Sequence, residues 1–267
     1  MAKKTIRQLA EQFKADPASL TPAELNTIRK ELKRSQGKKG DKYDAHKATM
    51  AERMRAASKA GRDIGTIPEI LNIERREACR FDLALFGKTY VPGALSMPFS
   101  KDHHEVVARI QDAALHGALY GLGMARGSGK TTWSRIGCLW ALSYAHRRYL
   151  FLIGASEPKA IKNLQALKQF IRFGDDYFAD FPEIAYPVRC VGGVAQRAGG
   201  QLCGDKPTLI RWDADEVVLP TVPPPANWPK EWALRPDGMV PTSGSCVSVS
   251  GLTGEGIRGS LMTLDTG

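Results

Sequence analysis

Apolar residues recur at helical spacing through the first sixty positions of the chain. Residues 6–13 place isoleucine, leucine and phenylalanine at the i, i+3, i+7 spacing of an amphipathic helix. Residues 21–24, Thr-Pro-Ala-Glu, have the form of a capping box with proline at the first helical position, which predicts a second helix. We expect the Gly-Lys-Lys-Gly of 37–40 to end it and a third helix to cover about 44–60. The apolar stripes are thin, which indicates a small bundle or helices that dock on another surface.

The middle of the chain alternates short apolar runs with amphipathic segments. Residues 61–68 have the composition of a linker, and helices are expected over 75–86 and 104–119. Residues 118–125 and 149–155 are short apolar runs typical of buried strands, and helical spacing follows each of them. This alternation predicts an α/β fold with a parallel sheet flanked by helices.

Beyond residue 174 the chain becomes rich in glycine and proline. Short strands are predicted at 208–212 and 217–219, around a turn, and another at 246–250. Seven of the 16 prolines fall in 220–241, so this stretch is expected to be a loop or an insertion. The chain is therefore divided into a helical arm and one larger domain.

Positive charge is concentrated in the arm, which we place at residues 1–62. These residues contain sixteen Lys and Arg and seven Asp and Glu, so they carry +9 of the net charge of +10, while the domain at 63–267 is almost neutral. A concentrated basic segment attracts polyanions such as nucleic acid. The alternative is a solvated helical face that keeps the chain soluble.

Composition excludes several classes of protein. With 43% hydrophobic and 25% charged residues the chain can form a folded core. It has no apolar run near the roughly 18 residues of a membrane span, and no apolar stretch behind its first residues that would indicate a secretory signal. The five cysteines form no Cys-x-x-Cys pair, which favours a reducing compartment over a disulfide scaffold or a zinc site.

The strongest motif is a glycine-rich loop between a predicted strand and a predicted helix. A nucleotide phosphate needs converging backbone N–H groups, a helix N-terminus, a lysine for the β and γ oxygens, and a hydroxyl for Mg²⁺. The loop supplies these in order: Ala125, Arg126, Gly127, Ser128, Gly129, Lys130, Thr131 and Thr132. Met124 stands where the full pattern has glycine, and a chance Gly-Lys-Thr at a helix cap is the alternative. The motif predicts binding of ATP, with Thr131 as the ligand to Mg²⁺.

Arg126 comes one residue before the first glycine of the loop. A guanidinium at this position could reach the γ-phosphate and stabilise charge that develops in the transition state. A structural salt bridge is the alternative. The same arginine excludes a dinucleotide fingerprint, because it stands where a third glycine would be required after Gly121 and Gly123.

Hydrolysis would also require carboxylates for the metal ion and the attacking water. Asp215 and Glu216 form one candidate pair, although a surface turn joining two strands is the preferred interpretation of 213–216. Asp265, after the apolar run 261–264, is the second candidate. Neither fits well, so we expect the parallel sheet to be of the P-loop NTPase type and incomplete at the C-terminus. The chain would then be a fragment or a truncated product that holds the phosphate-binding half of an ATPase.

Two other groups of residues favour structural roles. His103 and His104 have no third ligand at helical spacing, which argues against a metal site. Trp133 and Trp140 lie on the helix predicted after the loop, and we expect them in the core rather than stacked on bases.

The sequence around the loop resembles the ATPase domain of the large subunit of tailed-phage terminases. Residues 125–132 are similar to Walker A variants of that family that lack the first glycine and carry an arginine. Residues 99–104 resemble the aromatic and histidine segment that approaches the loop near the adenine, and 149–156 resemble the second strand with its turn. Residues 210–220 and 243–259 resemble the strands and the Arg-Gly element that precede Walker B.

This resemblance implies the motor that packages phage DNA by coupling ATP hydrolysis to translocation. It implies that Lys130 and Arg126 are catalytic, with Arg126 as an arginine finger acting within its own chain. It also implies double-stranded DNA, the small terminase subunit and the portal protein as partners, a homo-oligomeric ring of the full-length protein, and the host cytoplasm. The family's RNase H-like nuclease domain would be missing. The alternatives are another P-loop NTPase, such as a helicase or kinase, or a non-catalytic fragment whose arm binds DNA or a protein.

Overall fold

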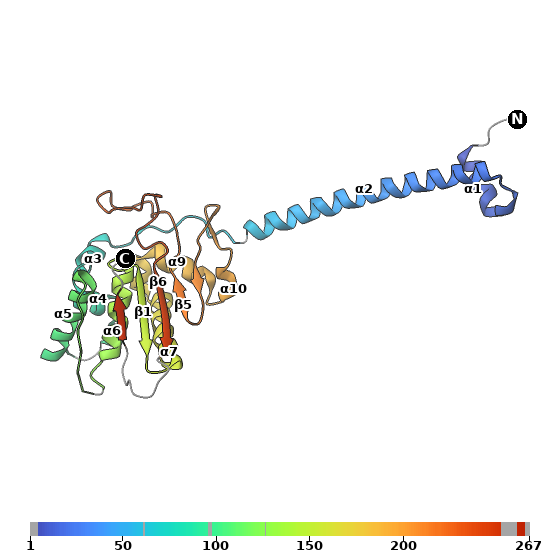
Figure 1. Cartoon of the computed structure of the whole chain (residues 1–267). Coiled ribbons are helices and arrows are strands. Elements are labelled where there is room, and N and C mark those ends of the chain that lie inside the picture. The colour runs from blue at the N-terminus through green and yellow to red at the C-terminus, as the bar shows by residue number, and fades with distance from the viewer. Residues whose placement is uncertain (1–4, 61, 96–97, 126, 252–260, 265–267) are drawn as a thin grey trace. The chain divides into compact units, whose positions relative to one another are not determined.

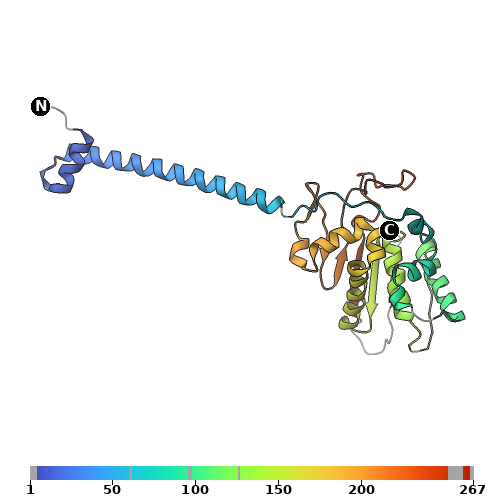
Figure 2. The same cartoon turned by 180° about the vertical axis from the view of Figure 1, so that it is seen from behind.

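A computed structural model of the chain describes residues 5–60, 62–95, 98–125, 127–251 and 261–264. Figures 1 and 2 show it from two opposite sides. The chain divides into two units, Met1–Ala60 and Gly61–Gly267, and each has its own internal contacts. The arm and the larger domain are therefore treated separately below.

The described part of the arm contains two α-helices and a short 3-10 turn. Helix α1 spans Ile6–Ala15, the turn η1 spans Pro17–Ser19, and α2 spans Pro22–Ala60. The predicted capping box at the start of α2 is confirmed: the Thr21 N–H donates to the Glu24 carboxylate at 2.9 Å, and the Glu24 N–H donates to the Thr21 hydroxyl at 3.4 Å. Leu9 and Leu20 are buried where α1 folds back against the start of α2.

The prediction of a break at 37–40 is wrong, because α2 continues through both glycines as one helix of 39 residues. A glycine inside a helix costs only about 1 kcal/mol relative to alanine. Ending the helix and nucleating another would sacrifice several backbone hydrogen bonds. The Lys-, Arg- and Glu-rich sequence before Gly37 favours the helical state, so these two residues do not interrupt it.

The domain is an α/β structure built on a mixed five-stranded sheet. Its central strands, β1 (Tyr149–Gly154) and β6 (Cys246–Gly251), run parallel, with Tyr149 opposite Cys246 and Gly154 opposite Gly251. The strand order is β4-β5-β6-β1-β7. The outer strands β4 (Arg211–Trp212), β5 (Glu216–Val218) and β7 (Leu261–Leu264) pair antiparallel. The α/β class is thus confirmed, whereas the all-parallel sheet is corrected to one parallel pair with antiparallel neighbours.

Helices pack on one side of this sheet and supply most of the core (Figures 1 and 2). The longest of them on the sheet, α7, packs on β1 and β6; it lies behind the strands in Figure 1 and in front of them in Figure 2. A separate two-stranded ribbon contains β2 (Leu202–Cys203) and β3 (Lys206–Pro207). The helices are α3 (Ile73–Ala78), α4 (Leu83–Tyr90), η2 (Pro92–Ala94), α5 (Lys101–His116), α6 (Lys130–Ser143), α7 (Glu157–Phe173), α8 (Asp175–Asp180), α9 (Pro182–Val191) and α10 (Ala195–Ala198).

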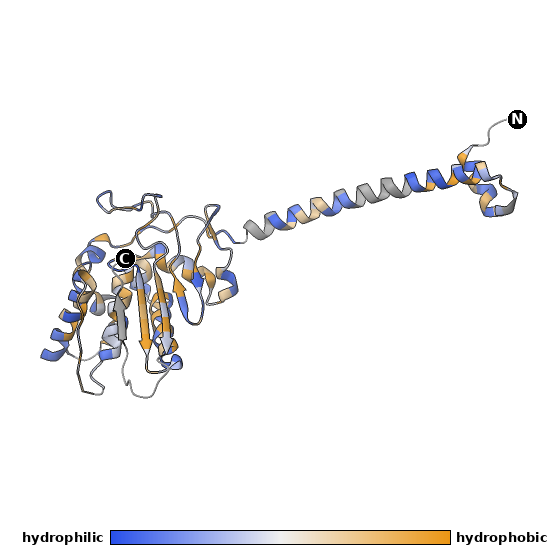
Figure 3. Ribbon diagram, in the orientation of Figure 1, coloured by the Kyte–Doolittle hydropathy of each residue, from blue (hydrophilic) through white to orange (hydrophobic). Residues whose placement is uncertain are grey.

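The hydrophobic core is aromatic and lies between α4, α6, α8 and α9. Trp133 and Trp140 of α6 are fully buried, which confirms their predicted place in the core. Tyr177, Phe181 and Phe86 pack beside them with ring centroids about 5 to 6 Å apart. Figure 3 shows the hydrophobic residues gathered in the strands and the helices that face them, whereas the coloured part of α2 is mostly hydrophilic.

The strand predicted at 118–125 does not form. This stretch is irregular, and the side chain of Leu119 is 92% exposed. Gly117 adopts a left-handed conformation that ends α5, and Gly121 and Gly123 lower the strand propensity of the segment. The place beside β1 is taken by β7 instead, which pairs antiparallel with it.

Two smaller boundaries also differ from expectation. The helix predicted at 75–86 is two helices, because the Asp82 carboxylate accepts the Leu85 N–H at 2.8 Å and caps a new helix there. The predicted linker at 61–68 packs on the domain: Ile67 is buried, and the Ile64 N–H donates to the Leu202 carbonyl at 2.9 Å. The proline-rich stretch 220–241 contains neither helix nor strand, as expected.

Candidate functional site

The glycine loop leads directly into the N-terminus of α6. Gly127 and Gly129 both adopt left-handed backbone conformations, with φ of 85° and 75°, which side-chain-bearing residues rarely adopt. Gly129 is the N-cap residue, and Lys130 is the first residue of the helix. The first N–H groups of a helix have no acceptor within the helix, and its dipole favours negative charge there. The loop therefore ends at a position suited to an anion.

Lys130 folds back over the loop that precedes it. Its ammonium group donates to the carbonyl oxygen of Met124 and to that of Ala125, the latter at 3.0 Å. The Ser128 hydroxyl donates to the same Ala125 oxygen at 2.7 Å. No acidic partner of Lys130 is found in the described part of the chain. The lysine is thus held by neutral carbonyl groups, which an anionic group could replace.

The other predicted loop residues lie around this turn. Thr131 is exposed in the first turn of α6, and within the described residues its hydroxyl has no partner. Thr132 is partly buried beside it. Arg126 lies outside the described residues, so its predicted role as an arginine finger stays a prediction.

Helix α5 contacts the loop through a histidine. The Nε2 atom of His103 lies 3.1 Å from the Ser128 carbonyl oxygen. The Ser100 N–H donates to Nδ1 of the same ring at 3.0 Å, so Nδ1 is an acceptor and the proton resides on Nε2. His103 therefore donates to the loop and fixes the Ser128–Gly129 peptide. The carbonyl and N–H of a trans peptide point in opposite directions, so the Gly129 N–H faces away from the histidine.

Phe99 forms a second contact between this segment and the start of α6. Its ring meets that of Trp133 edge-on at 5.1 Å between centroids, and the Lys88 ammonium group lies 4.6 Å from its centre. The resemblance predicted that 99–104 approaches the loop, and both Phe99 and His103 contact residues of the segment 128–133. One feature of the sequence could have indicated that His103 has a structural role, namely the Ser-x-x-His capping arrangement at the start of α5.

The candidate carboxylates at 213–216 belong to a β-hairpin. Strands β4 and β5 pair antiparallel, and the Asp213 N–H donates to the Glu216 carbonyl at 3.0 Å, which confirms the turn interpretation of this stretch. The Glu216 carboxylate accepts from Arg211 at 2.9 Å, and this contact lowers the pKa of Glu216. Asp215 lies in the turn, where its carbonyl accepts the Val249 N–H. The alternative candidate, Asp265, lies outside the described residues.

A cavity of about 170 Å³ lies away from the glycine loop. Its walls include Arg76, Tyr144, Trp228 and Trp232, and Tyr144 directly follows the last residue of α6. The loop lies at the opposite end of that helix. This cavity is therefore separate from the predicted phosphate site.

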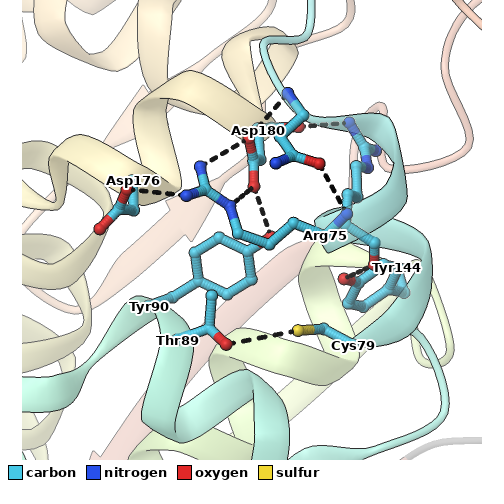
Figure 4. A network of polar contacts seen from close by, with 9 residues as sticks. Arg75, Cys79, Thr89, Tyr90, Tyr144, Asp176 and Asp180 are labelled. Carbon is cyan, nitrogen blue, oxygen red and sulfur yellow. Dashed lines mark hydrogen bonds and ion pairs between the residues drawn. The ribbon is translucent and has the colours of Figure 1, made fainter.

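A network of polar contacts around the buried Asp180 joins α3, α4 and α8 and is shown in Figure 4. Asp180 is fully buried and accepts from Arg75 Nε at 2.6 Å and from the Tyr90 hydroxyl at 2.8 Å. Arg75 also reaches Asp176 at 3.1 Å. Burial raises the pKa of Tyr90, and the hydrogen bond to Asp180 raises that of Arg75. Every charge in the cluster has a partner, so its role is to hold α3 and α4 on α8.

Comparisons with known proteins identify no family for this chain. No protein-family model, curated protein or solved structure matches it. In the described residues, no helix is both long enough and apolar enough to cross a membrane. The same residues contain no group of three or more His, Cys, Asp or Glu side chains placed to hold a metal ion.

Proposed function

We propose that this chain binds ATP with Mg²⁺ at the glycine loop and acts as the ATPase part of a DNA-packaging motor of the phage terminase type. One observation carries the nucleotide part of the proposal. Two left-handed glycines lead into a long helix whose first residue is a lysine, and among the described residues the ammonium group of that lysine contacts carbonyl oxygens of the loop. This combination of a helix N-terminus and a lysine held by neutral groups suits a phosphate chain.

Each residue of the loop has a separate role in binding the nucleotide. The N–H groups at the start of α6 would donate to phosphate oxygens, and Lys130 would exchange the carbonyls of Met124 and Ala125 for the β and γ oxygens. The exposed Thr131 hydroxyl would be a ligand of Mg²⁺, which neutralises phosphate charge when it is bound. His103 keeps the Ser128–Gly129 peptide in one orientation, so the loop has its phosphate-binding conformation before the nucleotide binds.

The motor part of the proposal rests on the resemblance of residues 99–104 and 125–132 to terminase large subunits. In that setting the chain would couple hydrolysis to translocation of double-stranded DNA, with the small subunit and the portal protein as partners. The contacts of Phe99 and His103 with 128–133 support this assignment, because they join two segments that the resemblance relates to one site.

A second candidate is nucleotide binding without efficient hydrolysis. It is favoured by the pairing of Glu216 with Arg211 in an antiparallel hairpin, which engages one carboxylate of the candidate pair Asp215 and Glu216. Under this alternative the loop still binds the nucleotide, but turnover of ATP is slow. Both candidate functions predict nucleotide binding, but they predict different rates of phosphate release from ATP.

Thermal unfolding with and without a non-hydrolysable ATP analogue and Mg²⁺ tests the site. We expect the analogue to raise the Tm of the full chain and Lys130→Ala to abolish the increase, while Lys159→Ala, which removes an exposed lysine of α7, leaves it unchanged. An equal increase in the Lys130→Ala variant would reject the proposed site. Release of phosphate from ATP by the unmodified chain then separates the motor from the second candidate.

A further inference from the structure

One face of the long arm helix α2 carries a group of exposed cations. Arg29, Lys30, Lys33 and Arg34 are all exposed, and at about 100° per residue they fall within an arc of about 140°. Further along the helix the same arc contains the exposed cations Lys47 and Arg55 together with the exposed acids Asp44 and Glu52, so the positive charge is densest at 29–34. The six cations are called the basic face below.

The acidic and apolar residues near the start of α2 lie on other sides of the helix. Glu24 and Glu31 fall on the opposite side at the same helical spacing. Leu25 and Ile28 are partly buried at the end of α2 that contacts α1. The basic face is therefore left open to solvent rather than packed in the arm.

Few of these cations are neutralised within the arm. Arg34 approaches Glu31 at 3.8 Å with its side chain 79% exposed, so this pair is a weak surface contact. Arg29, Lys30 and Lys33 have no acidic partner among the described residues. A group of unneutralised cations on a rigid rod attracts a polyanion whose charges are also regularly spaced.

We infer that the basic face of α2 is a binding surface for the phosphate backbone of double-stranded DNA. The choice of DNA among polyanions rests on the proposed function, whereas the surface itself does not depend on it. At 1.5 Å per residue, Arg29 and Arg55 are about 39 Å apart along the helix, slightly more than one turn of B-form DNA. The face therefore contacts phosphates over about one turn without reading bases, and binding is independent of sequence.

The composition of α2 favours nucleic acid over a lipid surface. A helix that lies on a membrane needs a broad apolar face rich in Trp, Phe or Leu. Helix α2 contains no Trp or Phe, and the exposed large apolar side chains among those that the structure describes in it are Leu32, Met50 and Met54. This narrow set gives little apolar area to bury in a bilayer, so anionic vesicles serve as a competing partner in the test.

The test measures binding of the full chain to a fluorescently labelled DNA duplex at salt concentrations from 50 to 200 mM. We expect R29Q/K30Q/K33Q/R34Q to weaken binding at least tenfold at about 100 mM salt and to reduce the slope of log K against log salt by about 3. Gln is a good helix former, and circular dichroism checks that the helix is retained. The charge-preserving variant R29K/R34K is expected to bind like the unmodified chain.

A matched control removes four cations from the domain. The variant K159Q/R197Q/K206Q/K230Q, whose four residues are exposed, is expected to keep most of the affinity and slope. Equal binding by the arm variant and the unmodified chain, an equal loss in the control, or a preference of α2 for anionic vesicles would each overturn the inference. Lys130→Ala is expected to leave DNA binding unchanged. The variant R29Q/K30Q/K33Q/R34Q is expected to keep the increase in Tm that the ATP analogue gives. Failure of one proposal is therefore distinguishable from failure of the other.

Discussion

The imidazole of His103 and the carbonyl of Ser128 are joined by a contact of 3.1 Å between Nε2 and the oxygen. This contact links α5 to the glycine loop across 25 positions of sequence. Because this contact holds a peptide of the predicted phosphate-binding loop, we expect His103→Ala to weaken binding of an ATP analogue by about three- to tenfold. This loss is the equivalent of one ordinary hydrogen bond. Titration of the analogue in the presence of Mg²⁺ measures the change.

The neighbouring His104 provides the control for this variant. It is exposed and has no hydrogen bond to the loop in the described structure, although its ring lies 5.6 Å from that of Phe99. His104→Ala is expected to retain nearly full affinity for the analogue. If both variants bind equally well, the contact of His103 with Ser128 does not organise the site.

Gly127 tests the backbone of the loop. A Cβ added there meets no atom within 4 Å, so alanine would not clash, but its φ of 85° is unfavourable for any L side chain. We expect Gly127→Ala to lower the free energy of unfolding by about 1 kcal/mol and to reduce the protection that the analogue gives. Urea unfolding with and without the analogue measures both effects.

Gly123→Ala is the matched substitution for Gly127→Ala. A Cβ at Gly123 also meets nothing within 4 Å, and Gly123 does not have a positive φ. The substitution should therefore leave stability within about 0.5 kcal/mol and protection unchanged. A loss equal to that of Gly127→Ala would show that the left-handed conformation of Gly127 is unimportant.

The elements that local pattern determines were predictable from the sequence. The apolar run at 149–155 forms β1, the alternation at 246–250 forms β6, and Pro158 lies in the first turn of α7. The hairpin around Asp213 was also predicted, because a charged turn separates two short apolar runs. Each of these follows from residues that are neighbours in sequence.

Features that depend on competition between distant segments were not predictable. The run at 118–125 has the composition of a strand, yet β1 pairs with Leu261–Leu264. The sequence pattern alone does not show which of two possible strands will pair with the edge of β1. The continuity of α2 through Gly37 and Gly40 depends on a balance of small propensity terms. The contact of His103 with the loop and the burial of Asp180 likewise require tertiary structure.

Asp180 is expected to be the most sensitive single position of the buried network in Figure 4. Its carboxylate is fully buried and accepts from Arg75 and Tyr90. We expect Asp180→Asn to lower the free energy of unfolding by about 3 kcal/mol, because it leaves a guanidinium and a hydroxyl without their charged acceptor. Urea unfolding followed by tryptophan fluorescence measures this loss.

Asp176 is the control for Asp180, since both carboxylates bind the same guanidinium. Its side chain is 60% exposed, and the contact with Arg75 is 3.1 Å. Asp176→Asn should change the free energy of unfolding by less than about 1 kcal/mol. A larger effect for Asp176→Asn than for Asp180→Asn would contradict the view that burial determines the strength of the network.

His146 should make the stability of the domain depend on pH. Burial lowers the pKa of its imidazole below the ordinary 6.5 and outweighs the hydrogen bond to the Arg80 carbonyl, which raises it; the charges of Arg80 and Arg147 lower it further. The ring packs on Trp140 at 4.6 Å, and its Nε2 lies 2.8 Å from the Arg80 carbonyl oxygen. The neutral form is thus the one that fits the folded state, whereas the unfolded chain takes up a proton near pH 6.5.

The sign of the effect follows from this difference in proton binding. Well above pH 6.5 both states hold a neutral imidazole, and the contribution of His146 to stability is complete. As pH falls toward the lower folded pKa, the unfolded state binds the proton first and is stabilised relative to the folded state. We expect Tm to fall between pH 7.5 and 5, and to fall less in His146→Gln, whose amide N–H can still donate to the Arg80 carbonyl. His104→Gln, which changes an exposed histidine, should follow the unmodified chain. Parallel curves for His146→Gln and the unmodified chain would show that another group accounts for the loss in acid.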